Sequence, residues 1–287
     1  MHDIATAVRI GGIQLRKNLF SQRTGMIFLL EGIYLFALVQ PVREMAIDTG
    51  YSATPFALAF LACDATVQMV LMAGAVALFA NAPFEDETHP YLIVRSGRRA
   101  WIIGNSIYLI AMSVIYVLFL WIMSMIPLIP KIVFKLEWGK IWGTLAETDA
   151  RRQYQILFEV SNAVKRMYQP GIALFYTLLL EWGCVAFLGA CVYCGNSVSS
   201  KPLGVWIGAG IAFFDIMIYN LFPASWITYS PLSLAMISNL IHSRWGISIS
   251  YSMGFFGMGF AIMIFVSYIY GQLMRKNKEE RTWTSQS

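Results

Sequence analysis

Four carboxylates stand alone inside long apolar stretches of this sequence. Glu31, Asp64, Glu181 and Asp215 have mainly apolar neighbours, and no Lys or Arg accompanies them within those stretches. A charge at the centre of a bilayer costs about 2.5 kcal/mol or more, so we expect these side chains to face a protein interior. There they would line a path for a cationic or amphipathic substrate, or relay protons. The alternative is a structural role, in which each carboxyl group is hydrogen-bonded to neighbouring helices or to the backbone.

Motifs for other kinds of chemistry are missing from the sequence. An intramembrane aspartyl protease would use two membrane aspartates, but Asp64 stands in Cys-Asp-Ala and Asp215 in Phe-Asp-Ile, which match neither Tyr-Asp nor Gly-x-Gly-Asp. No Gly-x-x-x-x-Gly-Lys-Ser/Thr sequence occurs, so the chain has no loop of that type to hold ATP phosphates. The three histidines are scattered without metal-type spacing. We therefore expect a chain that is not an enzyme and holds no cofactor or metal of its own.

The elements that must position these carboxylates are membrane helices. Of the 287 residues, 57% are hydrophobic and 13% are charged, and the mean hydropathy is +0.59. A soluble domain carries about a quarter charged residues, so a soluble enzyme is excluded. We predict an all-α membrane protein, a single transmembrane domain over residues 1–287, because helices satisfy their own backbone groups in lipid. The six predicted spans are residues 26–42, 56–80, 101–129, 171–194, 203–222 and 251–270.

The positions of Lys and Arg predict the orientation of the chain. Of the 21 basic residues, twelve fall on the side of the termini and nine on the other side. The twelve are Arg9, Arg16, Lys17, Arg23, Arg95, Arg98, Arg99, Lys201, Arg275, Lys276, Lys278 and Arg281. We predict a bacterial plasma-membrane protein with both termini in the cytoplasm, a cytoplasmic tail over residues 274–287 and an extracytoplasmic loop over residues 130–169. The net charge of +5 then signals orientation, and no nucleic acid is expected as a partner.

Three further segments have their own patterns. Residues 1–25 combine apolar and basic positions at helical spacing, which predicts an amphipathic interface helix leading into the first span. Residues 223–250 are semi-apolar but interrupted by Pro223 and Pro231, which favours a re-entrant or interfacial helical segment before the last span. Apolar residues spaced three and four apart over 157–167 predict a helix in the extracytoplasmic loop.

The predicted cytoplasmic loop over residues 83–100 is the most informative connection. It begins with three acids, continues with four apolar residues and ends with three Arg around a Ser-Gly turn. A solvated connector has no need of the apolar residues, so one interpretation is a short helix that docks into a cleft of a partner. The alternative is an interfacial loop whose Arg residues only enforce orientation. The candidate docking residues are Glu85, Asp86, Glu87, Tyr91, Leu92, Arg95, Arg98 and Arg99.

In this layout the chain resembles the permease subunit of type-two ATP-binding-cassette exporters. The shared features are the basic N-terminal helix, the six spans, the acidic patch after the second span and the Ser-Gly-Arg-Arg stretch at residues 96–99. The Ser-Pro-Leu segment at residues 230–232 is also similar. The chain departs from the family at Thr88-His89-Pro90, where a Gly-Thr pair often stands, and in its long outer loop.

The resemblance implies a transport subunit that works with other chains. Residues 83–100 would form the coupling helix seated on a separate cytoplasmic ATPase, which would bind ATP and Mg²⁺. A second permease subunit, identical or related, would complete the path for a hydrophobic, amphipathic or cationic substrate such as a peptide, a lipid or a drug-like compound. The main alternative is a proton- or cation-coupled secondary transporter, which would use the intramembrane carboxylates and would not need the docking segment.

Overall fold

The computed structural model describes residues 2–83, 96–199, 202–241 and 247–284, and the regular structure in this part of the chain is helical. Five helices are long and apolar enough to cross a membrane, so the chain is an all-α protein with several candidate membrane spans. They are α2 (Gln22–Asp48), α6 (Arg98–Met125) continued by the 3-10 helix η1 (Ile126–Lys131), α10 (Pro170–Val198), α11 (Leu203–Leu221) and α14 (Ile249–Thr284).

The second predicted span is divided in the structure. Instead of one helix over residues 56–80, there is a short helix α3 (Ala57–Leu61), a turn, and helix α4 (Ala65–Phe79). Asp64 causes the division, because its side chain accepts the backbone N–H groups of Thr66 (2.9 Å) and Val67 (3.2 Å) and so caps the start of α4. The apolar pattern of this stretch predicts burial, but it does not reveal the break.

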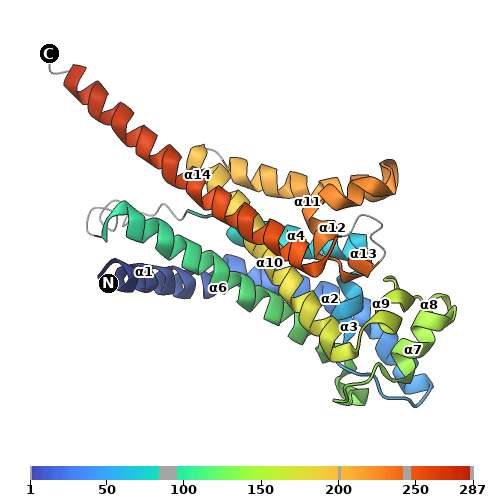
Figure 1. Cartoon of the computed structure of the whole chain (residues 1–287). Coiled ribbons are helices and arrows are strands. Elements are labelled where there is room, and N and C mark those ends of the chain that lie inside the picture. Colours follow the sequence, from blue (N-terminus) through green and yellow to red (C-terminus); the bar gives the residue numbers. More distant parts are fainter. Residues whose placement is uncertain (1, 84–95, 200–201, 242–246, 285–287) are drawn as a thin grey trace.

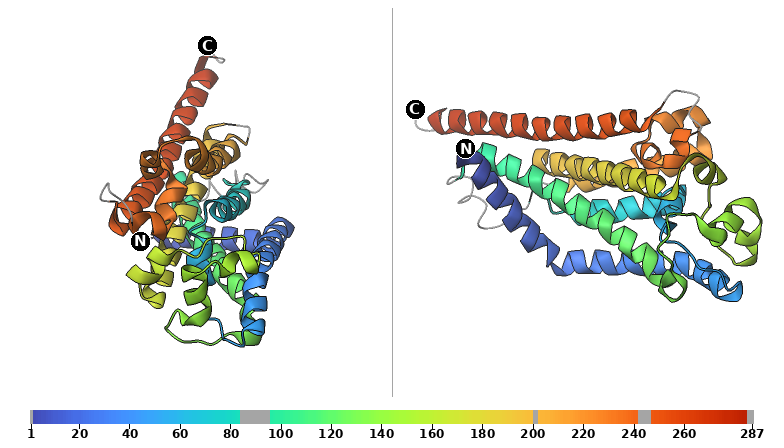
Figure 2. Two further views of the ribbon diagram at one scale, coloured as in Figure 1. Left: turned by 90° about the vertical axis from the view of Figure 1, so that its right-hand side faces the viewer. Right: turned by 60° about the horizontal axis from the view of Figure 1, so that its bottom comes forward.

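The long helices lie alongside one another, and both termini are at the same end of the bundle (Figure 2). Helix α10 contacts α4, α6, α11 and α14. Of its 18-residue apolar stretch, 61% is buried, which makes α10 the centre of the bundle. The corresponding value for α14 is 11%, and Figure 1 shows the C-terminal part of α14 extending beyond the other helices. The interior that could hold a functional site is therefore built around α10.

The helix predicted over residues 1–25 ends earlier in the structure, at Leu19, and it is docked on the bundle. Helix α1 (His2–Leu19) packs against α6, where a Cβ at Gly11 would lie 2.8 Å from the carbonyl oxygen of Gly104. Gly11 and Gly104 allow the two helices to approach this closely, because neither residue has a Cβ. The chain then turns at Ser21, whose hydroxyl accepts the N–H of Thr24 and caps α2. The exposed side of α1 remains apolar at Ile4 and Val8.

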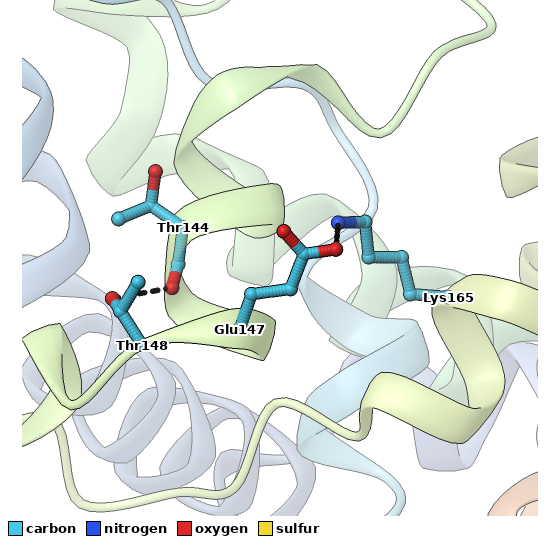
Figure 3. A network of polar contacts seen from close by, with 4 residues as sticks. All are labelled: Thr144, Glu147, Thr148 and Lys165. Carbon is cyan, nitrogen blue, oxygen red and sulfur yellow. Dashed lines mark hydrogen bonds and ion pairs between the residues drawn. The ribbon is translucent and has the colours of Figure 1, made fainter.

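The segment over residues 130–169 contains three short helices at the end of the bundle opposite the termini (Figure 2). They are α7 (Gly139–Glu147), α8 (Ala150–Gln153) and α9 (Asn162–Met167). The Lys165 ammonium pairs with Glu147 at 2.7 Å and joins α9 to α7, while the Thr148 hydroxyl donates to the Thr144 carbonyl (Figure 3). The predicted helix over 157–167 begins only at residue 162, because Ser161 caps α9 there.

The described part of the connection between α11 and α14 contains three short helices. These are η2 (Ala224–Tyr229), α12 (Pro231–Ala235) and α13 (Ile237–Ile241). The residues from Ser230 to Ile237 are buried, and α12 contacts α4, α10 and α11. This segment thus enters the bundle instead of lying on its surface.

Candidate functional site

Glu31 lies on α2 and is buried between α4 and α6. Gly74 of α4 leaves the space for its carboxyl group, because a Cβ at that position would overlap with Glu31 and with the hydroxyl of Tyr116. Tyr116 of α6 interacts with Glu31 and donates its own hydrogen bond to the carbonyl of Leu71 at 2.6 Å. The Oε2 atom of Glu31 has no hydrogen-bond partner among the described residues.

Glu181 of α10 is fully buried opposite Gln68 of α4, which is also fully buried. The two side chains face each other, yet neither the carboxylate oxygens nor the amide atoms have a partner in hydrogen-bonding geometry in the described part of the chain. Buried polar groups without partners are rare and costly in folded proteins. A proton, a water molecule or a cationic group bound here would satisfy these atoms.

Asp215 of α11 is buried against the segment that precedes α14. Its Oδ1 atom accepts hydrogen bonds from the hydroxyl groups of Ser230 and Ser233, and Ser230 caps the start of α12. Asp215 thereby fastens α12 to α11, which is a structural role that the sequence pattern alone did not indicate. Its second oxygen, Oδ2, has no hydrogen-bond partner among the described residues and remains available.

Shared neighbouring residues connect the four predicted carboxylates, which we together call the polar region. Tyr34 interacts electrostatically with both Glu31 and Asp64, and Tyr116 with both Glu31 and Glu181. Cys184 similarly interacts with Glu181 and Asp215. Within the described residues none of the four carboxylates forms an ion pair. A group of acids without basic partners in a low-dielectric interior attracts cations. Asp64 also caps α4 and is only partly buried, so its structural role is the clearest of the four.

An apolar pocket of about 140 Å³ lies on another side of α10, between α6 and α14. Ile110, Trp182, Met253 and Phe260 are among its lining residues, and the lining is wholly apolar. The indole N–H of Trp182 donates to the carbonyl of Ile110 at 3.4 Å and joins α10 to α6 beside the pocket. Such a pocket fits a hydrocarbon chain or another apolar group.

Most of the predicted docking residues, from Glu85 to Arg95, lie outside the described residues. Arg98 and Arg99 open α6 and are directed toward α14. The Arg98 guanidinium donates to the carbonyl of Gly271, and Arg99 interacts with the side chain of Tyr268. The two arginines therefore join the start of α6 to α14, in addition to any part that they take in docking.

A group of contacts at the end of α4 could not be predicted from the sequence. Asn196 of α10 donates to the carbonyls of Ala80 (3.0 Å) and Ala82 (2.7 Å), and its side-chain oxygen accepts the N–H of Gly204 at 2.9 Å. Arg23 of α2 donates to the carbonyl of Ala77 at 2.7 Å. We call these contacts the Asn196 clamp. In the sequence, Gly195-Asn196-Ser197 after an apolar run indicates only the end of a helix. This pattern does not predict the contacts of Asn196 with other helices.

No family model matches the chain, and no similar curated protein or solved structure was found. In the described part of the chain no group of three or more His, Cys, Asp or Glu could hold a metal ion. The polar region, the apolar pocket and the Asn196 clamp are thus the observations on which a function can be argued.

Proposed function

We propose that this chain is the membrane-spanning permease subunit of an ATP-driven exporter, similar to the type-two ATP-binding-cassette permeases. The observation that supports it best is how the loop between α4 and α6 is attached. Before the loop, the Asn196 clamp links the end of α4 to α2, α10 and α11. After the loop, Arg98 links the start of α6 to α14. A force applied to this loop would reach all five long apolar helices.

The proposed mechanism is alternating access driven by a separate ATPase. When the ATPase closes on ATP and Mg²⁺, it pushes on the loop that contains Glu85 and Glu87, and the helices shift between two packed arrangements. The chain itself performs no chemistry in this mechanism. A second permease subunit, identical or related, completes the path, and nucleic acid takes no part.

The proposed topology has six crossings, with α3 and α4 together forming the second. Helix α4 has 15 residues, which span about 22 Å as an α-helix, so α3 is needed to complete a crossing of about 30 Å. The position of both termini at one end of the bundle supports an even number of crossings. We place that end in the cytoplasm of a bacterium, following the distribution of basic residues.

The proposed substrate is hydrophobic or amphipathic and bears a positive charge. The unpaired carboxyl groups of Glu31, Glu181 and Asp215 suit the charge, and the apolar pocket beside Trp182 suits the rest of such a molecule. A lipid, a peptide or a drug-like cation has this combination of properties.

A second candidate function is proton- or cation-coupled secondary transport. The unpartnered pair of Glu181 and Gln68 favours it, because a buried carboxyl group without a basic partner can bind and release a proton or a cation. This mechanism needs no ATPase and assigns no role to the loop over residues 83–100.

The first experiment is purification of the chain in mild detergent and identification of what accompanies it. We expect an ATPase, and we expect ATP-dependent uptake of ethidium, a lipophilic cation, by inside-out vesicles that contain both proteins. Uptake driven by a pH gradient without ATP would favour the second candidate and contradict the exporter.

The coupling residues provide the more specific test. The double variant Glu85→Gln with Glu87→Gln should insert normally and reduce ethidium uptake at least tenfold, while the complex still hydrolyses ATP. The matched control is Glu44→Gln, which changes an exposed glutamate near the C-terminal end of α2. If the double variant transports as the wild type does, the docking assignment is wrong.

A further inference from the structure

A short irregular segment directly follows the end of a membrane span. Lys131 is the last residue of the span that begins at Arg98. Five residues later, the side chain of Leu136 reaches the start of α10, where a Cβ at Gly171 would lie 3.3 Å from it. Residues 131–136, which we call the interfacial strip, therefore lie between the end of one span and the start of another, at the level of a membrane surface.

The backbone of the interfacial strip is held in place. The N–H of Ala53 donates to the carbonyl of Lys131, and the N–H of Val133 donates to the carbonyl of Ala53, both at 2.9 Å. Ile132 packs against the hydrophobic core. Past Val133 the backbone turns, because the N–H of Lys135 donates to the carbonyl of Val133 at 3.1 Å, and the following side chains leave the core.

The interfacial strip combines apolar and basic side chains. Phe134 and Leu136 are 76% and 80% exposed. Lys131 and Lys135 stand among them in the sequence, and neither lysine forms an ion pair within the described residues. The nearest acid in the sequence is Glu137, which is exposed. Exposed large apolar side chains interleaved with unpaired lysines are the features of a segment that lies in the headgroup layer.

We propose that the interfacial strip binds anionic phospholipids of the adjacent leaflet. Phe134 and Leu136 insert among the upper parts of the acyl chains, while the ammonium groups of Lys131 and Lys135 bind the headgroup phosphates. The position of the strip between two spans and its unpaired positive charges favour a lipid surface over a second copy of the chain. This inference does not depend on the proposed transport function.

Insertion is tested with an environment-sensitive label. The variant Phe134→Cys is labelled with a nitrobenzoxadiazole dye in nanodiscs that each hold one chain. The label should emit at shorter wavelength than the dye does in water. Its emission should also be quenched by lipids with a doxyl group near the headgroup. The control is Glu159→Cys, an exposed position of the same outer segment, which should keep a water-like emission. Labelled wild-type protein serves as the blank, because three of the four native cysteines are buried.

Recognition of the headgroup is tested by thermal unfolding in the same nanodiscs. Wild-type protein should gain thermal stability when phosphatidylglycerol replaces part of the phosphatidylcholine, and the double variant Lys131→Gln with Lys135→Gln should lose most of that gain. The control Arg152→Gln, at another exposed basic position, should keep it.

Three results would overturn the proposal. The first is a water-like emission from position 134, and the second is an equal phosphatidylglycerol effect in the double variant. The third is a blue shift that appears only when two chains share a nanodisc, which would assign Phe134 and Leu136 to contact between copies. None of these measurements uses an ATPase, so they leave the proposed transport function untouched.

Discussion

Glu181 and Gln68 present four buried polar atoms to each other without a hydrogen bond in good geometry. If this pair binds a cationic substrate or a proton, the charge on Glu181 matters more than its shape. If the pair is structural, an amide that keeps the shape should serve as well. Replacing the carboxyl group by an amide therefore separates the two roles.

We expect Glu181→Gln to unfold at the same temperature as the wild type, because the amide is nearly isosteric and no ion pair of Glu181 is lost. ATP-dependent ethidium uptake should nevertheless fall at least tenfold. Asp64→Asn is the matched control. An Asn side chain can still cap α4, so ethidium uptake by this variant should stay near normal. Normal uptake by Glu181→Gln would show that the carboxyl group is structural.

The ion pair between Glu147 and Lys165 predicts a pH dependence of stability. The Lys165 ammonium donates a hydrogen bond to the Glu147 carboxylate and attracts it, which lowers the pKa of Glu147 from its ordinary value of 4.5. A lowered pKa in the folded state means that the pair stabilises the fold above the ordinary pKa. This contribution is lost as the pH falls through the lowered pKa. The effect is small, because the Glu147 side chain is exposed.

We expect Glu147→Gln to lower the melting temperature slightly at neutral pH and at low salt. Below the lowered pKa of Glu147 the melting temperatures of the variant and the wild type should converge. Melting curves recorded from neutral pH to below pH 4.5 check this, with Glu159→Gln as a control that lacks the ion pair. A difference that persists unchanged in acid would show that the pair does not account for it.

At the scale of single elements, helix α4 depends on contacts from distant parts of the chain. The last carbonyl groups of a helix have no partner within it, and here side chains of α2 and α10 supply the donors. Asn196 also holds the first turn of α11, and a Cβ at Gly195 would lie 2.5 Å from the Cα of Gly204. The end of α4 and the start of α11 are therefore expected to move as one unit.

We expect Asn196→Ala to lower the free energy of unfolding by about 1–3 kcal/mol, because two buried or partly buried carbonyls and one N–H lose their partner. Amide hydrogen exchange should accelerate together at residues 80–82 and 203–206. The control Asn220→Ala removes an exposed side chain that only bonds the Ile216 carbonyl of its own helix. Acceleration at only one of the two segments would disprove their linkage through Asn196.

The elements could be predicted from sequence to different degrees. Apolar length alone predicted α2, α6, α10, α11 and α14, because lipid exposure and burial both select apolar residues. The break at Asp64 and the late start of α9 at residue 162 depend on side-chain caps, which compete with the helical pattern. The hydrogen bonds from Asn196 to Ala80 and Ala82 join residues more than 100 positions apart, so no local pattern could indicate them.

At the scale of the whole molecule, composition predicted the class of the protein, and the bundle explains how the charges are arranged. Glu31 is buried between α4 and α6, Glu181 lies on α10 and Asp215 is held against α12. Hydropathy alone could not show this, because it does not identify contacts between helices. Part of the candidate site remains a prediction, since Glu85, Asp86, Glu87, Tyr91, Leu92 and Arg95 lie outside the described residues. The six crossings and their orientation are likewise predictions that await labelling of loops in intact cells.

The Asn196 clamp also constrains the order in which the protein can be completed during synthesis. Ala80 precedes Asn196 by 116 residues, so the ribosome finishes α4 long before its final donors exist. Until α10 is made, the carbonyls of Ala80 and Ala82 must rely on water or headgroups for their hydrogen bonds, which favours a position near the membrane surface. Helix α4 can therefore take its final depth only after α10 and the start of α11 have entered the membrane, late in the maturation of the chain.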